Sequence, residues 1–218
     1  MAANEFVSFV DLTALFSRYG IPVPRGELVQ SAEEAVKAYH EIDAPVALKI
    51  ISPFESHKTD KGLLKLGLQS AEAVFSSANV LFGKAEGMAV EGLLVQEMAP
   101  EGVEMIAGLV NDPTFGVMLV FGAGGILVEL LDDVTLRHAP VSPQEAKWLI
   151  RRHAIYRLLQ GYRGSPPADV DALAELLARL SVLGKALEGE LESLDINPVI
   201  VSPAGVNVVD YRMKRKDV

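Results

Sequence analysis

The residue best suited to covalent chemistry in this sequence is His57, which lies in the polar stretch Glu55-Ser56-His57-Lys58-Thr59-Asp60 between Pro53 and Gly62. Proline ends the preceding apolar segment and glycine lets the chain turn back, so we expect an exposed loop with His57 at its tip. A neutral imidazole nitrogen can attack phosphorus near pH 7, and the N-phosphoryl bond that forms is labile enough to pass its group on. His57 is therefore a candidate phosphoryl carrier, and the alternative is a solvated loop histidine.

A second set of polar residues lies on a predicted β-hairpin near the C-terminus. Two apolar segments, 194–201 and 206–212, flank the turn sequence Ser202-Pro203-Ala204-Gly205. Such a turn between two apolar segments predicts a pair of antiparallel strands. A turn centred in the middle of this sequence fixes which residues of the two strands lie opposite each other.

This register places Asn197 opposite Asp210, and it places Asp195 on the same face, opposite Arg212. Directly opposed side chains have Cβ atoms about 5 Å apart. An amide oxygen beside a carboxylate forms part of a cage for Mg2+, which prefers oxygen ligands and completes its shell with water and phosphate oxygens. The sequence thus predicts a magnesium site at Asn197 and Asp210. The alternative is a polar face in water, with Asp195 and Arg212 as a surface ion pair.

Two cations are candidates for binding a nucleotide. Lys49 lies within the apolar segment 46–51, where it either points at a phosphate as a point charge or extends its amine to the strand edge. Arg137 is either a phosphate contact or a surface residue. The glycine-rich sequence 122–125 matches neither a Walker loop nor a dinucleotide fingerprint, so by itself it indicates only a tight turn.

Composition excludes several classes of function. The 218 residues include 20 basic and 29 acidic residues, and the net charge of -9 argues against general binding to nucleic acid or to an anionic membrane. The absence of cysteine excludes disulfides, thiolate catalysis and zinc–thiolate sites. The sequence has no signal-peptide pattern at its start and no apolar run near the roughly 20 residues of a membrane span, so we expect a cytoplasmic protein.

The pattern of apolar residues predicts an α+β chain of two lobes. Helical spacing, capping boxes at Ser31 and Ser142 and alternating apolar segments mark the elements. The expected helices span 6–20, 31–42, 71–82, 142–153 and 169–183, and the expected strands before the hairpin span 46–51, 64–68, 93–98, 104–110, 117–121 and 126–131. The last three strands should form an antiparallel meander. We therefore expect a first lobe at 1–95 with the histidine loop and a second lobe at 96–218 with an antiparallel sheet and the hairpin.

A series of motifs follows in order along the chain: Val46-Ala47-Leu48-Lys49-Ile50, Ser56-His57-Lys58-Thr59-Asp60, Leu94-Val95-Gln96-Glu97-Met98, Asn111-Asp112-Pro113-Thr114-Phe115-Gly116, Phe121-Gly122-Ala123-Gly124-Gly125-Ile126 and Leu194-Asp195-Ile196-Asn197-Pro198. Together they resemble the ATP-grasp (beta) subunit of the NDP-forming acyl-CoA synthetases, of the ADP-forming acetyl-CoA synthetase type. The resemblance runs from about Phe6 to Arg212. It implies an ATP-grasp fold, in which two α/β lobes clasp a nucleotide.

The resemblance also implies an activity, that of an acid–thiol ligase that works with a partner. In this family a CoA-binding alpha subunit converts acyl-CoA and phosphate to an acyl phosphate and takes the phosphoryl group onto its own histidine. A second histidine, on a swinging loop of the ATP-grasp subunit, passes the group to Mg–ADP to make ATP. The expected assembly is a heterotetramer of two alpha and two beta subunits.

The family's functional residues map onto this sequence by motif. His57 matches the histidine of the swinging loop, and Lys49 matches the phosphate-binding lysine. The other matches are Gln96, Glu97 and Met98 beside adenine, Glu104 as a nucleotide-contacting carboxylate, and Asn197 with Asp210 as Mg2+ ligands. Asp195, by its place in the motif, would orient or stabilise phosphorylated His57. One departure is that Gly62 is followed by Leu63, where the family usually has paired glycines, and this predicts a stiffer lower end of the loop.

Three alternatives remain at this point. The nucleotide-binding subunit of succinyl-CoA synthetase is the nearest, but it carries a further C-terminal domain, which we do not expect because the sequence ends soon after the hairpin. A nucleotide-sensing module without catalytic activity would bind ATP and never be phosphorylated on His57. The ATP-grasp part of a protein acetyltransferase would be fused to an acetyltransferase domain. The acyl group and the choice between ADP and GDP are not encoded in any motif of this chain.

Overall fold

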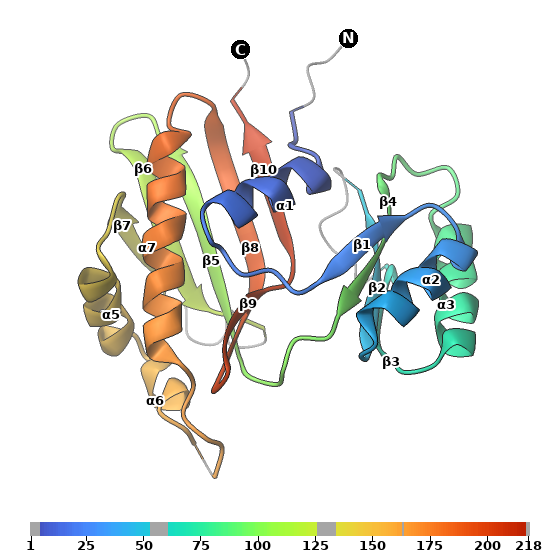
Figure 1. Cartoon of the computed structure of the whole chain (residues 1–218). Coiled ribbons are helices and arrows are strands. Elements are labelled where there is room, and N and C mark those ends of the chain that lie inside the picture. Colours follow the sequence, from blue (N-terminus) through green and yellow to red (C-terminus); the bar gives the residue numbers. More distant parts are fainter. Residues whose placement is uncertain (1–4, 53–60, 126–133, 163, 217–218) are drawn as a thin grey trace. The chain divides into compact units, whose positions relative to one another are not determined.

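The computed structural model describes residues 5–52, 61–125, 134–162 and 164–216, and the chain forms two compact units (Figure 1). Unit 1 comprises Met1–Val7, Asp11–Val23 and Ala99–Val218, and unit 2 comprises Ser8–Val10 and Pro24–Met98. The chain passes from unit 2 to unit 1 for the last time between residues 98 and 99, close to the expected boundary after residue 95. Residues 11–23 belong to unit 1, however, and not to the first lobe, because Phe16 and Thr13 contact Tyr211.

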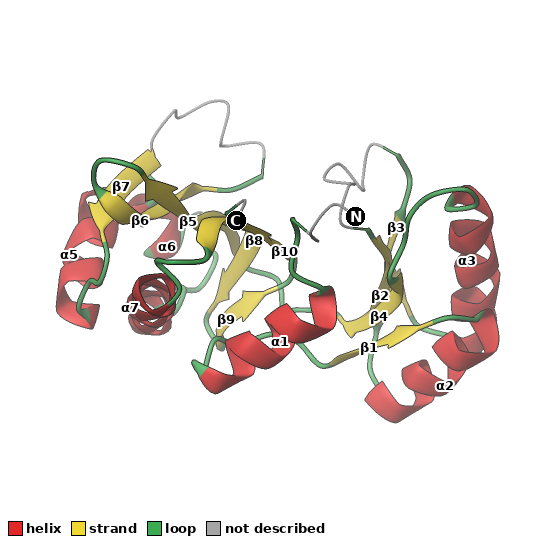
Figure 2. Cartoon of the chain, turned by 90° about the horizontal axis from the view of Figure 1, so that it is seen from above, coloured by secondary structure: helices red, strands yellow, loops and turns green. Residues whose placement is uncertain are grey.

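Unit 2 is a four-stranded antiparallel sheet with two helices, as the ribbon shows in two views (Figures 1 and 2). Its strands, in spatial order, are β1 (Gly26–Val29), β4 (Gly92–Glu97), β2 (Val46–Ile51) and β3 (Leu64–Leu68), and its helices are α2 (Ala32–Ile42) and α3 (Ala71–Lys84). The core consists of apolar side chains that alternate along the strands, such as Leu48 and Ile50, packed with small residues of α2 and with Val74 and Leu81 of α3. The helices therefore cover one face of this sheet.

The start of α2 confirms half of the predicted capping box. The Ser31 hydroxyl oxygen accepts the backbone N–H of Glu34 at 3.1 Å, which satisfies one of the unpaired donors of the first turn. The carboxylate of Glu34 does not return to the N–H of Ser31. It accepts the N–H of Gln30 at 2.7 Å instead, so it joins the helix start to the residue that follows β1.

Unit 1 contains the larger sheet, in the order β10-β8-β5-β6-β7, with β9 paired to β8. The strands are β5 (Val103–Asp112), β6 (Gly116–Ala123), β7 (Val134–His138), β8 (Leu191–Ser202), β9 (Gly205–Val208) and β10 (Tyr211–Arg215). The helices of this part of the chain are α1 (Phe9–Arg18), α5 (Pro143–Arg152), α6 (Tyr156–Leu159) and α7 (Val170–Ala186). Helix α7 packs on β5, β6 and β8, and α5 packs on α7.

The two faces of the unit 1 sheet differ in their side chains. One row of directly opposed residues consists of Leu194, Leu109, Leu119 and Arg137, and its three leucines are fully buried on the face that α7 covers. The neighbouring row consists of Asp195, Gly108, Val120 and Leu136, which must point to the opposite face because successive side chains alternate. We call this opposite face the Asp195 face.

Most of the predicted elements are confirmed, but the short helix α6 was not predicted, and three further differences concern the strands and the first helix. Phe6 was expected in the first helix, and this expectation is wrong: Phe6 forms a β-bridge with Lys214, and the helix begins at Phe9. Strand β1 was not predicted because its four residues include only one buried side chain, Val29, so no alternating pattern exists. The expected strand at 126–131 lies outside the described residues, and the strand that pairs with β6 is β7.

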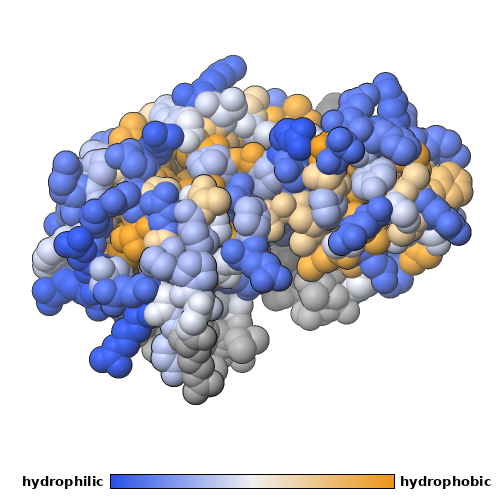
Figure 3. All heavy atoms as spheres, turned by 60° about the horizontal axis from the view of Figure 1, so that its bottom comes forward, coloured by the Kyte–Doolittle hydropathy of each residue, from blue (hydrophilic) through white to orange (hydrophobic). Residues whose placement is uncertain are grey.

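Hydrophilic residues cover much of the surface seen in Figure 3, and apolar residues lie between them in smaller groups. None of the described helices is long and apolar enough to cross a membrane.

Candidate functional site

The terminal hairpin has the register that the sequence predicts. Arg212 pairs with Asp195 and Tyr211 with Ile196, while β9 continues the same register from Val208 opposite Val199. At the junction between β9 and β10, the backbone N–H of Asn197 donates to the carbonyl oxygen of Asp210 at 3.0 Å. Asn197 and Asp210 are therefore neighbours across the hairpin, as the prediction requires.

A β-bulge lies at this same point on the other edge of β8. Ile196 pairs with Ala107 of β5 and Val199 with Met105, so two residues of β8, Asn197 and Pro198, lie opposite the single residue between them on β5. Pro198 has no N–H and fits where the ladder lacks a donor, while its carbonyl oxygen accepts the N–H of Val209 at 3.3 Å. Bulges redirect side chains, and this one lies where the predicted Mg2+ ligands meet.

The electrostatics of Asp195 combine two opposed effects. Loss of hydration raises the pKa of Asp195 above its ordinary value, and the positive charge of Arg212 lowers it by a smaller amount. Asp195 nevertheless keeps part of its surface exposed, and so does Asn197. These side chains are therefore partly enclosed by neighbouring residues, which can orient them, and partly exposed, so that they can contact a ligand.

The hairpin fits a hard divalent cation only as a partial cage. Asn197 and Asp210 offer an amide and a carboxylate oxygen, and the N–H of Tyr211 donates to Oδ1 of Asp210 at 3.2 Å, which orients that carboxylate. Among the described residues, no group of three His, Cys, Asp or Glu side chains is arranged to hold a metal ion. A cation held here would need further oxygen ligands from phosphate and water, which is the usual way in which Mg2+ is bound with a nucleotide.

In unit 2, Lys49 and Gln96 lie on the same face of the sheet. Gln96 pairs with Ala47, two residues from Lys49, so the two polar side chains are diagonal neighbours on β2 and β4. Lys49 is 5% exposed and Gln96 is 2% exposed. The lysine therefore does not extend to solvent at the strand edge, which was the alternative to a functional role.

The other residues of the predicted adenine-binding segment have defined roles within unit 2. The N–H of Glu97 donates to the carbonyl oxygen of Arg25 at 2.8 Å, and that of Met98 donates to Pro45 at 2.9 Å. The carboxylate of Glu97 accepts from Nε of Arg25 at 2.8 Å. A base bound beside Glu97 and Met98 would therefore contact carbonyl oxygens or side chains, because both backbone N–H donors are already used.

Glu104 lies at a pocket of about 550 Å3 in unit 1. The pocket is lined by Gly102, Val103, Glu104, Gly124, Gly125, Leu158, Tyr162 and Ser165. A Cβ atom on Gly124 would lie 2.7 Å from the backbone of Glu104, and one on Gly125 would lie 2.6 Å from its carboxylate, so the glycine sequence lets the chain pass directly beside this side chain. The glycines, which the sequence indicated only as a turn, thus form a wall of the pocket. Tyr162 and Ser165 were not predicted, because no motif includes them.

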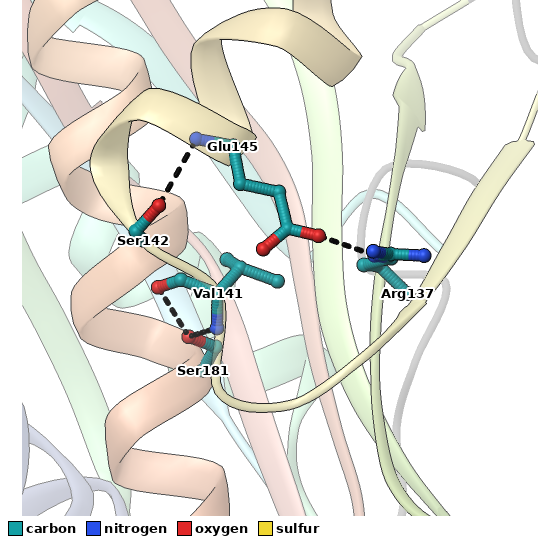
Figure 4. A network of polar contacts seen from close by, with 5 residues as sticks. All are labelled: Arg137, Val141, Ser142, Glu145 and Ser181. Atoms are coloured by element: carbon teal, nitrogen blue, oxygen red, sulfur yellow. Dashed lines mark hydrogen bonds and ion pairs between the residues drawn. The ribbon is translucent and has the colours of Figure 1, made fainter.

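Arg137 is not brought together with the hairpin oxygens. It lies in the row of Leu119 on the face covered by α7, opposite to the Asp195 face. Its Nε donates to the carboxylate of Glu145 at 2.5 Å, while the Glu145 N–H donates to the hydroxyl of Ser142 at 3.1 Å (Figure 4). Glu145 therefore joins the first turn of α5 to β7, and a contact of Arg137 with the nucleotide stays a prediction.

His57 lies outside the described residues, and only the chain on either side of residues 53–60 can be placed. Before this segment, Ser52 donates its hydroxyl to the carbonyl oxygen of Ala89 at 2.7 Å. After it, Gly62 has a φ of +64°, which glycine adopts readily, and Leu63 is 2% exposed in the core of unit 2. The departure from paired glycines is thus explained by a core residue that fixes this end of the segment.

Comparisons with known proteins identify the family. The model of a family described as an ATP-grasp domain matches residues 3–214. The beta subunit of ADP-forming acetate–CoA ligase I from Pyrococcus furiosus is 37% identical over 199 residues, which are 89% of this chain and 85% of that subunit. The chain belongs to the ATP-grasp domains of the ADP-forming acetate–CoA ligases.

Members of this ATP-grasp family differ in length. ADP-forming acetate–CoA ligase I from Archaeoglobus fulgidus is 41% identical over 198 residues, which are 89% of this chain but 29% of that protein. The chain therefore spans less than a third of some relatives and most of others.

Solved structures agree with the family. The dinucleotide-forming acetyl-coenzyme A synthetase 1 of Ca. Korarchaeum cryptofilum, in complex with coenzyme A and Ca-AMPCP, matches with a TM-score of 0.88 and 42% identity over 94% of this chain and 90% of that chain. A second structure of that synthetase, with coenzyme A and Mg-AMPPCP, matches with a TM-score of 0.84 and 40% identity over 97% and 93%, and its phosphohistidine segment points towards the nucleotide-binding site. The predicted ATP-grasp fold is confirmed.

Proposed function

We propose that this chain is the nucleotide-binding component of an ADP-forming acyl-CoA synthetase, an acid–thiol ligase that makes ATP from acyl-CoA, ADP and phosphate in a reversible reaction. The observation that carries the proposal is the hairpin of unit 1, whose register and bulge bring Asp195, Asn197 and Asp210 together. An acidic and amide-bearing hairpin of this kind suits a nucleotide bound with a divalent cation. The family of the chain supports the same conclusion.

The chemistry assigned to this chain is phosphoryl transfer through His57. In one direction, an imidazole nitrogen of His57 forms a bond to the γ-phosphorus of ATP while the bond from that phosphorus to the bridging oxygen breaks, and ADP leaves with the electron pair. The reverse step makes ATP. In such transfers the protein mainly aligns the reacting groups and neutralises the charge of the phosphates. Asp195 would accept a hydrogen bond from the imidazole and so orient it.

The nucleotide contacts follow from the chemistry of each side chain. Lys49 would place its ammonium group against a phosphate, and Gln96 on the same face of unit 2 would bind beside the base. Glu104 carries negative charge and is unsuited to phosphate, so in its pocket it would accept hydrogen bonds from sugar hydroxyls. Asn197 and Asp210 would hold Mg2+, which when bound screens the phosphate charge.

The partner is proposed from the names and lengths of relatives. The Pyrococcus furiosus relative is a beta subunit, and the Archaeoglobus fulgidus relative is more than three times as long as the matched part. We infer that a CoA-binding alpha subunit or domain supplies the acyl group and phosphate, in a heterotetramer of two alpha and two beta subunits. We infer a cytoplasmic location, because ADP and CoA are available there as substrates.

The test is phosphorylation of the chain itself. Incubation with Mg2+ and ATP radiolabelled at the γ-phosphate should add an acid-labile, alkali-stable phosphate, and His57→Ala should abolish it. His138→Ala is the matched control, because His138 is an exposed histidine of β7, and it should be labelled like the unaltered protein. Binding of ATP without any label on His57 would instead support a nucleotide-sensing module.

A further inference from the structure

Arg212 brings positive charge to the Asp195 face of unit 1. It lies directly opposite Asp195 on β10. Lys214 lies two residues further along the same strand, but its ammonium group bonds to Glu5 at 2.6 Å and to Glu192 at 2.7 Å. The charge of Lys214 is thus compensated by two carboxylates, and Arg212 lies two residues nearer to Asp210, one of the predicted Mg2+ ligands.

The N-terminal segment fixes the position of the Arg212 side chain. Residues 5–7 run along β10: the N–H of Val7 donates to the carbonyl oxygen of Met213 at 3.1 Å, and the N–H of Arg215 donates to that of Glu5 at 2.8 Å. This pairing brings the ring of Phe6 to 4.5 Å from Cζ of Arg212. A guanidinium group over an aromatic ring is held by the cation–π attraction, which orients its plane.

The carboxylates of the hairpin would repel a phosphoryl group unless a nearby cation offset their negative charge. A phosphoryl group that approaches Asp195 and Asp210 meets two carboxylates, and like charges repel. A guanidinium group presents paired N–H donors that match two oxygens of a phosphate. Asp195 and Arg212 side by side thus offer a hydrogen-bond acceptor and a pair of donors on one face of unit 1.

We propose that Arg212 binds the phosphoryl group in transit beside Asp195, and that Phe6 is the positioning residue that holds Arg212 in place. The inference rests on the proposed function of the hairpin. It gives a catalytic role to Arg212, which the sequence analysis named only as a possible ion-pair partner of Asp195. Arg212 forms no covalent bond in the transfer. It stabilises the negative charge on the phosphoryl oxygens while one bond to phosphorus forms and the other breaks.

The experiment compares variants of the whole chain in a single turnover with radiolabelled ATP and Mg2+. We expect Arg212→Gln to lower the rate of phosphate incorporation by about 100-fold, in line with the loss of one preorganised charge contact, and Arg212→Lys to lower it by about 10-fold. Phe6→Leu removes the ring but keeps apolar bulk and should lower the rate by roughly threefold, while Phe6→Tyr should retain it. Arg215→Gln is the control, because Arg215 is an exposed arginine of the same strand.

Two further measurements separate a catalytic role from a structural one. Added guanidinium ion at millimolar concentration should restore part of the rate of Arg212→Ala and none of the rate of Lys49→Ala. The midpoint of thermal unfolding identifies any variant whose fold is impaired. If Arg212→Gln incorporates phosphate at the unaltered rate, or loses no more than Arg215→Gln, the inference fails. If the unaltered chain takes up no acid-labile phosphate, the proposed function itself fails.

Discussion

Lys49 of unit 2 and Asp195 of unit 1 both lie in the interior of a strand, yet the lysine is 5% exposed whereas the aspartate keeps its side chain exposed. All six residues of β2 around Lys49 are buried. The strand β8 around Asp195 buries only the side that faces α7 and leaves Asp195 and Asn197 on the other. The two units thus hold charge differently, one inside the protein and one at its surface.

The two units would therefore bind a nucleotide in different ways. A buried ammonium group loses much of its hydration, so it is retained only where other polar or negative groups compensate it. It is also held in one position, which suits the fixed part of a ligand. Exposed carboxylate and amide oxygens keep their hydration and can exchange water for a cation when it arrives. Unit 2 would therefore offer a preformed contact, and unit 1 would offer a set of ligands that the bound cation and nucleotide complete.

The largest expected effect comes from the buried charge. Lys49→Met keeps the length and apolar stem of the side chain but removes the cation, and we expect phosphate incorporation from ATP to fall by about 100-fold to 1,000-fold. The free energy of unfolding should fall, because the polar or negative groups that compensate the buried ammonium group lose their partner. Single-turnover labelling and denaturant unfolding measure the two quantities. Lys65→Met, at an exposed lysine of β3, is the control, and an equal loss of rate in both variants would contradict the assignment.

A second prediction concerns the exposed oxygens. Asp210→Asn should raise the Mg2+ concentration that gives half-maximal labelling by about 10-fold to 100-fold, with a smaller change in the rate at saturating Mg2+. The charge of the carboxylate, and not its shape, attracts the cation. Titration of Mg2+ at fixed ATP checks this. Asn207→Asp, on β9 of the same hairpin, should leave the titration unchanged. An unaltered Mg2+ requirement in Asp210→Asn would remove Asp210 from the set of ligands.

A third, smaller effect is expected at the pocket of unit 1. Glu104→Gln should weaken ATP binding by about 10-fold, because hydrogen bonds to a charged group contribute about 1.5–3 kcal/mol. The loss should be smaller for 2′-deoxy-ATP if the carboxylate accepts from the sugar hydroxyls. Equilibrium binding of both nucleotides to the two proteins checks the prediction. Glu101→Gln, at an exposed glutamate nearby in sequence, is the control. Equal losses for both nucleotides would place the Glu104 contact away from the 2′-hydroxyl.

The smallest effect is expected at Arg137. Its ion pair with Glu145 is half exposed, and such pairs contribute about 0–1 kcal/mol to the free energy of unfolding. Arg137→Gln should therefore shift stability slightly and leave ATP binding unchanged, since Arg137 lies on the face away from Asp195. Glu145→Gln should give a similar shift in stability. A clear loss of ATP affinity in Arg137→Gln would instead support the prediction that Arg137 contacts the nucleotide.

The hairpin register could be predicted because a turn of proline and glycine between apolar segments admits few alignments. The capping serines Ser31 and Ser142 were recognisable for a similar reason, since the contacts are local in sequence. The bulge at Asn197 was not predicted, because it depends on how β5 pairs with β8 from a distant part of the chain.

The remaining misses have the same physical cause. Strand β7 exposes most of its side chains, so it carries no alternating pattern, and its place is set by pairing with β6. The partner of Arg137 is a glutamate that the sequence pattern assigned to a helix cap. The burial of Lys49 could not be predicted, because its position in a strand does not determine whether the long side chain stays inside the protein or extends to solvent at the strand edge.

The pairing of residues 5–7 with β10 has a practical consequence. A strand at the margin of a sheet presents unpaired backbone groups that can recruit another chain, and here the N-terminal segment occupies those groups. Recombinant versions that begin after Val7 would leave this margin bare and would be prone to self-association. Affinity tags for biochemical work are therefore better attached after residue 218 than in place of the first residues.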